Sequence, residues 1–171
     1  MRDNLHIRPV EKEDLEFIHK MRINPDVMDY WFSEPYTTLE KLKKNYEQQQ
    51  DNEAFRQFIL YHSNERIGYL GLYGINFRHR FAQFAIMIDP DYQGKGYATD
   101  ATKLMADYCF NQLNLHKLSL QVIKVNEKAV HIYKKVGFQV EGEQKNHYFV
   151  NGSYQDAYTM SVLREEYVNQ Q

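Results

Sequence analysis

One stretch of the chain, residues 84–98, constrains the fold more than any other. It reads FAIMIDPDYQGKGYA, an apolar run followed by a proline, two closely spaced glycines and the start of a helical pattern. The apolar run predicts a buried strand that ends at Pro90, and Gly94 and Gly96 allow the next loop to turn tightly. Free backbone N–H groups in a loop at the start of a helix bind phosphate well. The stretch therefore predicts a phosphorylated ligand.

The loop matches neither of two common nucleotide-binding motifs. Gly96 stands where a Walker P-loop needs Ser or Thr, and Thr99 stands where a dinucleotide-binding loop needs a third Gly or Ala. A strand-to-helix turn that binds nothing is the alternative. Gln93 before the glycines and Ala98 behind them favour a pyrophosphate site, because small residues let the ligand approach the helix, and Lys95 adds positive charge.

A second motif, VNEKAVHIYKKVGF at 125–138, predicts a short helix. Asn126 suits the N-cap, and Gly137 suits the position that follows the last turn. Apolar residues at 129, 132, 133 and 136 share one face, so Tyr133 should point into the protein. A core tyrosine is the ordinary explanation of that position. The order and spacing of the two motifs together favour a catalytic hydroxyl.

The pattern along the whole chain predicts an α/β (α+β) fold in a single domain, residues 1–171. The expected order is β-α-α-β-β-β-α-β-α-β-β, a mixed sheet flanked by helices. The expected strands cover 5–9, 54–61, 66–73, 81–88, 118–123 and the two arms of a hairpin turned at Asn151-Gly152. The expected helices cover 11–23, 37–50, a segment after the glycine loop, and 126–136.

Composition limits the environment and the partners. With 43% hydrophobic residues and a net charge of −2, the chain can build a core and lacks the basic balance of a nucleic-acid-binding protein. Its single Cys109 cannot form an internal disulfide, which fits a reducing compartment. No apolar run approaches the roughly 18 residues of a spanning helix. We expect a cytoplasmic protein that binds neither nucleic acid nor membrane.

The segment 23–40 has the composition of a site for an organic cation. It contains no Lys or Arg, whereas carboxylates and aromatic rings alternate along it. Carboxylates neutralise ammonium groups, and aromatic faces cover methylene chains. A helix–loop–helix with a solvated acidic face is the alternative. The residues concerned are Asp26, Asp29, Glu34 and Glu40, with Tyr30, Trp31, Phe32 and Tyr36 between them.

The two motifs resemble the signature motifs of the GCN5-related N-acetyltransferases (GNAT). The matching segments are 93–98, 126–129 and 132–138, and the resemblance in element order covers essentially the whole chain. Within that superfamily, YWFSEPY at 30–36 and NLHK at 114–117 are similar to segments of the bacterial spermidine N-acetyltransferases. The resemblance implies a GNAT fold with acetyl-CoA as cosubstrate and no metal or prosthetic group.

The resemblance also implies roles for individual residues. The backbone of Ile86, Met87 and Ile88 would hold the pantetheine arm and polarise the thioester, and Asn126 would contact the cofactor arm. Tyr133 would protonate the departing CoA thiolate as general acid. The N–H groups that would hold the pyrophosphate belong to Gln93, Gly94, Lys95, Gly96, Tyr97 and Ala98.

The expected acceptor is a polyamine such as spermidine or spermine. Candidate residues for binding it are Asp29, Trp31, Glu34 and Tyr36. An alkyl ammonium has a pKa of about 10.4 and must lose a proton before it attacks, so a base is needed. Candidates are Glu34 directly and Asp89 through water. The chain carries Ser33, Phe55, Gly71 and Gly74 where such enzymes commonly carry acids, and Gln83 where a glutamate is usual.

Two other functions remain open at this point. One is acetyl transfer to a different amine, either a protein N-terminus, as in the ribosomal-protein acetyltransferases, or an amino sugar. The other is an acetyl-CoA-binding module without catalysis, which an intact Tyr133 disfavours. We expect acetyl-CoA and a small amine as partners, together with self-association into a homo-oligomer.

Overall fold

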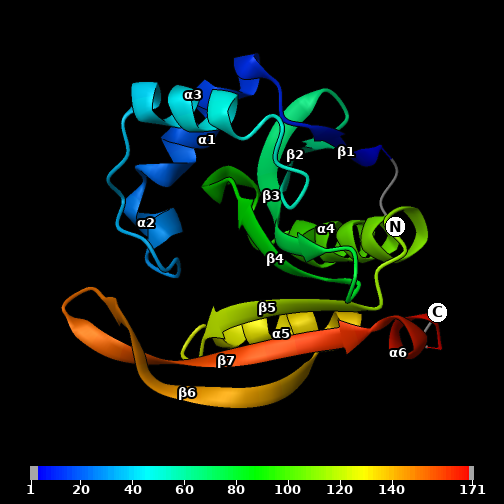
Figure 1. Cartoon of the computed structure of the whole chain (residues 1–171). Helices are drawn as coiled ribbons and strands as arrows, with labels where there is room; N and C mark the ends of the chain where they lie inside the picture. The colour runs from blue at the N-terminus through cyan, green and yellow to red at the C-terminus, as the bar shows by residue number, and fades with distance from the viewer. Residues whose placement is uncertain (1–3, 170–171) are drawn as a thin grey trace.

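Within residues 4–169, which the structure describes, seven strands form one mixed sheet in the order β1-β2-β3-β4-β5-β7-β6. The structure is a computed structural model of the chain (Figure 1). Neighbouring strands are antiparallel except β4 and β5, which are parallel. The strands are β1 (Leu5–Pro9), β2 (Arg56–His62), β3 (Glu65–Asn76), β4 (Phe81–Ile88), β5 (Lys117–Ile123), β6 (Gln139–Val150) and β7 (Ser153–Leu163).

Three helices cover one face of the first half of the sheet: α1 (Leu15–Arg22), α2 (Pro25–Met28) and α3 (Leu39–Gln48). As the helical spacing predicts, Leu15, Ile18 and Met21 are buried at the inner side of α1. They pack in one cluster with Ile59, Tyr69 and Met87, which lie side by side on β2, β3 and β4.

The other face of the sheet packs against α4 (Tyr97–Asp107) and α5 (Glu127–Val136). Ala101 and Met105 of α4 and Cys109 just beyond it are fully buried, four residues apart, so they form one apolar face. Burial raises the pKa of the Cys109 thiol, so it remains protonated as a core residue. The helix α6 (Arg164–Val168) follows β7.

Parallel strands β4 and β5 pair only at one end. Phe81, Ala82 and Gln83 pair with residues 117–119, and beyond them the two strands diverge. By contrast, β5 pairs with β7 along its whole length. The sheet is therefore continuous at one edge of the β4–β5 joint and open at the other (Figure 1), and this opening places the candidate site.

The predicted element order and mixed sheet are confirmed, with local differences. Asn24-Pro25 does end α1, yet the same residues begin α2, because the Asn24 side chain accepts a hydrogen bond from the Asp26 N–H and proline fits the first helical turn. The expected helix 11–23 starts with a 3-10 turn, Lys12–Asp14. Strand β3 extends to Asn76 instead of ending at Tyr73, because its pairing continues past a bulge, and β6 likewise continues through two shifts of register.

Asn151 and Gly152 turn the β6–β7 hairpin as predicted. Their φ angles are 49° and 80°, the positive values that a two-residue hairpin turn requires. None of the helices among residues 4–169 is long and apolar enough to cross a membrane.

Candidate active site

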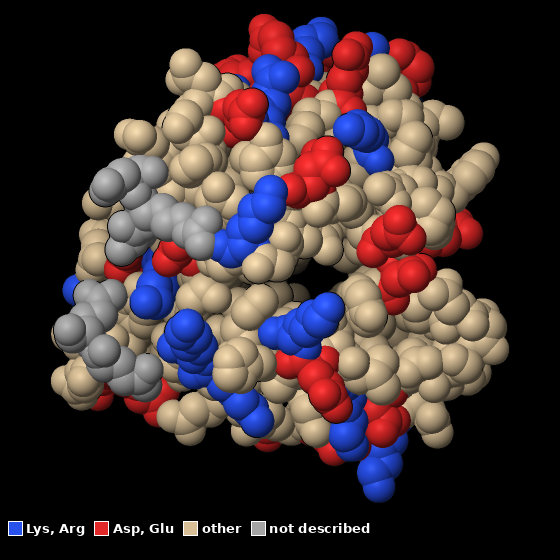
Figure 2. Space-filling view, turned by 180° about the vertical axis from the view of Figure 1, so that it is seen from behind, with Lys and Arg blue, Asp and Glu red and all other residues tan. Residues whose placement is uncertain are grey.

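A cleft of about 980 Å³ lies where β4 and β5 diverge. It receives residues from the α2 region, from β3 and β4, from the glycine loop, from β5 and from α5. Seen from behind in Figure 2, the surface is hollowed near the middle of the molecule, where the upper and lower parts separate. The cleft is long enough to carry a phosphate site at one end and an aromatic site at the other.

The glycine loop forms one end of the cleft. Gly94 and Gly96 have φ angles of 72° and 84°, a left-handed conformation that glycine adopts without strain. Gly96 directly precedes the first residue of α4, so the N-terminal end of the helix, with its partial positive charge, lies at the loop that lines the cleft. The side chain of Gln93 donates a hydrogen bond to the Ile88 carbonyl (3.0 Å), which ties the loop to the end of β4.

Most of the predicted cofactor-binding residues line this cleft. They are Ile86, Met87, Ile88, Gln93, Gly94, Gly96, Tyr97, Ala98 and Asn126. Asn126 caps α5 as predicted, since its side chain accepts a hydrogen bond from the Ala129 N–H (3.2 Å). Lys95 is not among the lining residues. Its ammonium donates to the Asp91 carbonyl (2.8 Å) and lies 5.3 Å from the centre of the Tyr92 ring.

Tyr133 of α5 lines the cleft together with residues of β4 and of the glycine loop. Its ring is half-buried and packs against Phe138, with 5.9 Å between ring centres. Burial raises the pKa of Tyr133 to about 12. Its hydroxyl is therefore fully protonated at neutral pH and can donate a proton into the cleft.

The aromatic end of the cleft differs from the sequence prediction. Of the predicted acceptor-binding residues, Trp31 lines the cleft, whereas Asp29, Glu34 and Tyr36 do not. Tyr36 is 73% exposed, and the Asp29 carboxylate accepts a hydrogen bond from the Asn151 side chain (2.9 Å) at the β6–β7 turn. Roles for these three residues in acceptor binding stay predictions.

The residues that do reach this end include one carboxylate. Asp26, from the first turn of α2, lines the cleft together with Tyr30, Phe32 and Ser33. Phe32 stacks on Tyr148 of β6 at 3.8 Å between ring centres, so the hairpin borders the cleft here. Asp26 is one of the four acids that the sequence shows in the segment 23–40, and no local pattern indicates which of these acids lines the cleft.

Tyr73 of β3 also lines the cleft and was not predicted. The sequence pattern Tyr69-x-Gly71-x-Tyr73 could have indicated this position of Tyr73. Alternate residues of a strand share a face, so the glycine leaves room between two aromatic rings on one face.

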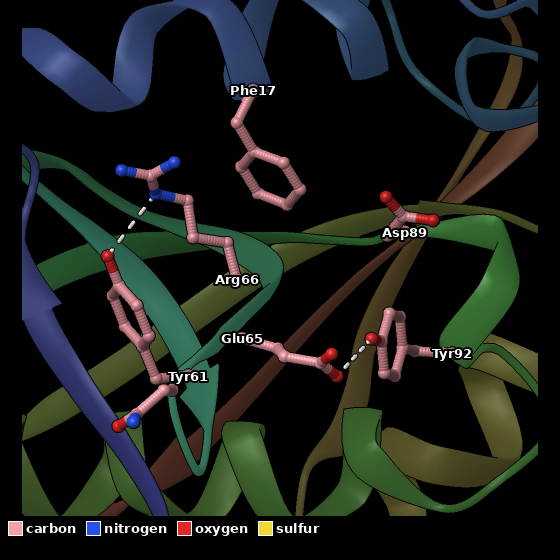
Figure 3. A pocket seen from close by; sticks show the side chains of 7 residues that line it. Phe17, Tyr61, Glu65, Arg66, Asp89 and Tyr92 are labelled. Carbon is pink, nitrogen blue, oxygen red and sulfur yellow. Dashed lines mark hydrogen bonds between the residues drawn. The ribbon is translucent and has the colours of Figure 1, made fainter.

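Asp89, the other candidate base, lies outside the cleft. It lines a separate, open pocket of about 520 Å³ beside Phe17, Arg66 and Tyr92 (Figure 3). One of its carboxylate oxygens accepts a hydrogen bond from the Asp91 N–H (3.0 Å), which shapes the start of the glycine loop. Its role as a base through water stays a prediction.

The pocket of Figure 3 is held by polar contacts of its own. The Tyr92 hydroxyl donates to the Glu65 carboxylate (2.6 Å), which raises the pKa of Tyr92 to about 12. Arg66 pairs with the fully buried Asp14 (2.8 Å). Across residues 4–169, no group of three or more His, Cys, Asp or Glu side chains is arranged to hold a metal ion.

Comparison with known proteins identifies related chains. The family profile described as "Acetyltransferase (GNAT) domain" matches residues 4–139. Spermidine N(1)-acetyltransferase of Escherichia coli K12 is 45% identical over 165 residues, which cover 96% of this chain and 89% of that protein. The enzyme of the same name from Vibrio cholerae is 41% identical over 170 residues, covering 99% and 98% of the two chains.

Solved structures show the same relationship. The crystal structure of spermidine N-acetyltransferase from Vibrio cholerae in complex with CoA and spermine superposes with a TM-score of 0.96 at 40% identity. The match covers 98% of this chain and 100% of that one. The fold and the sequence therefore agree along essentially the whole length.

Proposed function

This chain belongs to the acetyltransferase (GNAT) family, and from that premise we propose that it transfers the acetyl group of acetyl-CoA to a primary amine of a polyamine such as spermidine or spermine. The chain is an N-acetyltransferase with acetyl-CoA as its cosubstrate. What we propose is that the acceptor is a polyamine and that individual residues of the cleft have the following roles.

One observation carries the proposal. A single cleft runs from the glycine loop past Tyr133 to an aromatic end with the carboxylate of Asp26. Phosphate, thioester and amine thus meet groups of suitable chemistry in the required order. The names of the relatives at 41% and 45% identity support a polyamine as the acceptor.

On the donor side, recognition depends on backbone groups. The N–H groups at the start of α4 and in the loop bind the pyrophosphate, and their partial positive charge offsets its negative charge. Beyond Gln83 the backbone of β4 no longer pairs with β5, so its free N–H and C=O groups are available to the pantetheine arm and the thioester carbonyl. Asn126 borders the same arm.

The chemical step is direct attack of a neutral amine on the thioester carbon. The new N–C bond forms, the C–S bond breaks, and the sulfur leaves as a thiolate. Tyr133 donates its hydroxyl proton to that thiolate, and the proton that the acylated nitrogen loses returns through water to the Tyr133 oxygen, so the hydroxyl is restored. The remaining rate enhancement comes from holding the two reactants together.

On the acceptor side, Asp26 and the rings of Tyr30 and Trp31 bind the polyamine. The carboxylate attracts an ammonium group, and the rings cover its methylenes and face its charge. A polyamine carries several ammonium groups, so one can bind at Asp26 while another nitrogen reacts.

The proposal is tested by the release of free CoA thiol from acetyl-CoA with spermidine, spermine, putrescine or no amine. Saturable release that requires spermidine or spermine is the expected result. Thiol release only with a peptide N-terminus or an amino sugar would show that the acceptor belongs to one of those classes instead. Binding of acetyl-CoA without release of CoA thiol in the presence of any amine would indicate an acetyl-CoA-binding module without catalysis.

We also propose that the chain self-associates. Phe149 and Tyr154, at the end of the β6–β7 hairpin, are 65% and 64% exposed, and β6 is a free edge of the sheet. Exposed rings beside an open edge favour contact with another chain. Light scattering after size-exclusion chromatography measures the assembly, and a monomer at micromolar concentration would contradict it.

A further inference from the structure

Tyr73 enters the cleft from β3, beside the segment that is expected to hold the thioester. In the sheet, Tyr73 is paired with Gln83, Gly71 with Ala85 and Tyr69 with Met87. Residues 69, 71 and 73 share one face of β3, which is the face that α1, α2 and α3 cover. Tyr73, Gln83 and Ala85 all line the cleft.

Gly71 determines where the Tyr73 hydroxyl lies. A β-carbon at position 71 would lie only 2.6 Å from the Oη atom of Tyr73. The ring of Tyr73 therefore runs back along the strand over Gly71 and packs against Phe55, with 5.0 Å between ring centres. This brings the hydroxyl level with Ala85, one residue before the donor-binding segment 86–88.

The hydroxyl of Tyr69 fixes the hydrogen bonding of Tyr73. Tyr69 is 0% exposed, and its oxygen lies 3.2 Å from the Tyr73 oxygen. The other polar neighbour of Tyr69 is the guanidinium of Arg22, 5.6 Å from the ring centre, which can only donate hydrogen bonds. A buried O–H without an acceptor is costly, so Tyr69 donates to Tyr73. The Tyr73 oxygen then keeps one lone pair and its own O–H for a further partner.

The polar groups that β3 and β4 offer here are neutral. The two carboxylates that line the cleft, Asp26 and Glu127, come from α2 and α5. A carboxylate against the reacting nitrogen would favour its charged, unreactive ammonium form. A phenol oxygen accepts an N–H hydrogen bond without adding a negative charge, so it can orient the nitrogen at less cost to its deprotonation.

We propose that Tyr73 holds the reacting nitrogen of the acceptor, with the lone pair of its hydroxyl oxygen accepting one N–H hydrogen bond while the nitrogen lone pair faces the thioester carbon. This rests on the proposed function. Tyr69 and Gly71 act through Tyr73 as positioning residues, the first by donating to its oxygen and the second by leaving space for its ring.

The first test is Tyr73→Phe, which removes the hydroxyl and keeps the ring. We expect kcat/KM for the amine to fall about tenfold, the loss of one hydrogen bond, with KM for acetyl-CoA changed less than twofold. Tyr46→Phe is the matched control, because Tyr46 packs on the hydrophobic cluster that contains Tyr69 and donates to the Val10 carbonyl (3.3 Å) outside the cleft. It should leave both kinetic constants unchanged.

Gly71→Ala is the second, independent test. The added methyl group must displace the end of the Tyr73 side chain, which is a flexible neighbour, so the fold should survive. We expect a loss in kcat/KM for the amine similar to that of Tyr73→Phe. Combined with Tyr73→Phe, it should add little further loss, because both changes remove the same contact. Tyr69→Phe should give a smaller loss of the same kind.

The outcomes separate this proposal from the function on which it rests. If the wild-type chain acetylates a different primary amine, the polyamine proposal fails, and the variants are measured with that amine. Tyr73→Phe that keeps kcat/KM for the accepted amine within twofold, while acetyl-CoA still raises its melting temperature, overturns the role of Tyr73. A loss confined to KM for acetyl-CoA overturns it as well. A wild-type chain that acetylates no amine overturns both proposals.

Discussion

The two ends of the cleft are built in different ways. At the donor end, the lining comes from short contiguous segments, 86–88, 92–94, 96–99 and 125–129, in which the binding groups are mainly backbone. At the acceptor end, the lining side chains come from α2 and the segment after it and from β3 and β4, and tens of residues separate the α2 region from the two strands. A site that binds its ligand through backbone groups can therefore be predicted from a local sequence motif, whereas a site built from side chains depends on how distant elements pack.

The largest expected effect concerns the residue between the two ends. Tyr133→Phe removes the proton donor but keeps the ring in its contact with Phe138. We expect kcat to fall about 100-fold or more, the usual contribution of a general acid, with KM for acetyl-CoA almost unchanged. CoA release under saturating substrates measures it. Turnover near that of the wild type would remove Tyr133 as the acid.

A backbone change should affect the donor end alone. Gly94→Ala places a side chain at a φ of 72°, which costs roughly 1–2 kcal/mol and disturbs the loop, so KM for acetyl-CoA should rise about tenfold. Gly152→Ala is the matched control, since its φ is 80° and both sites have open space around the added methyl group. It should lower the free energy of unfolding by a similar amount without changing either KM. Equal KM values in the two variants would contradict backbone recognition.

Two substitutions of acidic residues test whether the sequence prediction or the cleft lining identifies the carboxylate that binds the polyamine. Glu34→Gln is the change that the sequence predicts to raise KM for spermidine, and Asp26→Asn is the change that the cleft lining favours. We expect about a fivefold rise for Asp26→Asn, the factor that roughly 1 kcal/mol gives, and less than twofold for Glu34→Gln. Steady-state kinetics with varied spermidine decide between them. The reverse ranking would restore Glu34 to the site.

The smallest expected effect is in the pH profile. Tyr133 has a raised pKa of about 12, so its protonated, active form persists well above pH 10. The rate at subsaturating polyamine should rise with pH as the ammonium group, with a pKa of about 10.4, loses its proton. No alkaline decrease should appear below about pH 11. A decrease centred near pH 9 would indicate a different acid.

Sequence reasoning succeeded where the signal was local. Gly94, Gly96 and Asn126 are each required by a turn or a cap at their own position, and the structure places all three as expected. The apolar spacing likewise identified the buried face of α1, because a helix brings residues three and four apart to one side.

Sequence reasoning is limited where a distant partner determines the position of a side chain. Asp29 is turned to Asn151, which lies 122 positions away in the chain, and no local pattern predicts that hydrogen bond. Tyr73 reaches the cleft only because Gly71 and Tyr69 direct its ring, and because β4 lies beside it. Asp89 is used to shape the loop that follows it, so a chemically suitable carboxylate faces another pocket.

The short pairing of β4 with β5 has a consequence for stability. The two parts of the sheet are joined at this boundary by three residue pairs, so a molecule bound in the opening bridges parts that the backbone itself joins weakly. A ligand that binds only the folded chain adds stability according to its concentration, about 2.7 kcal/mol at 100 times its Kd. The supply of acetyl-CoA around this protein would then set its resistance to unfolding and to proteolysis, as well as its rate.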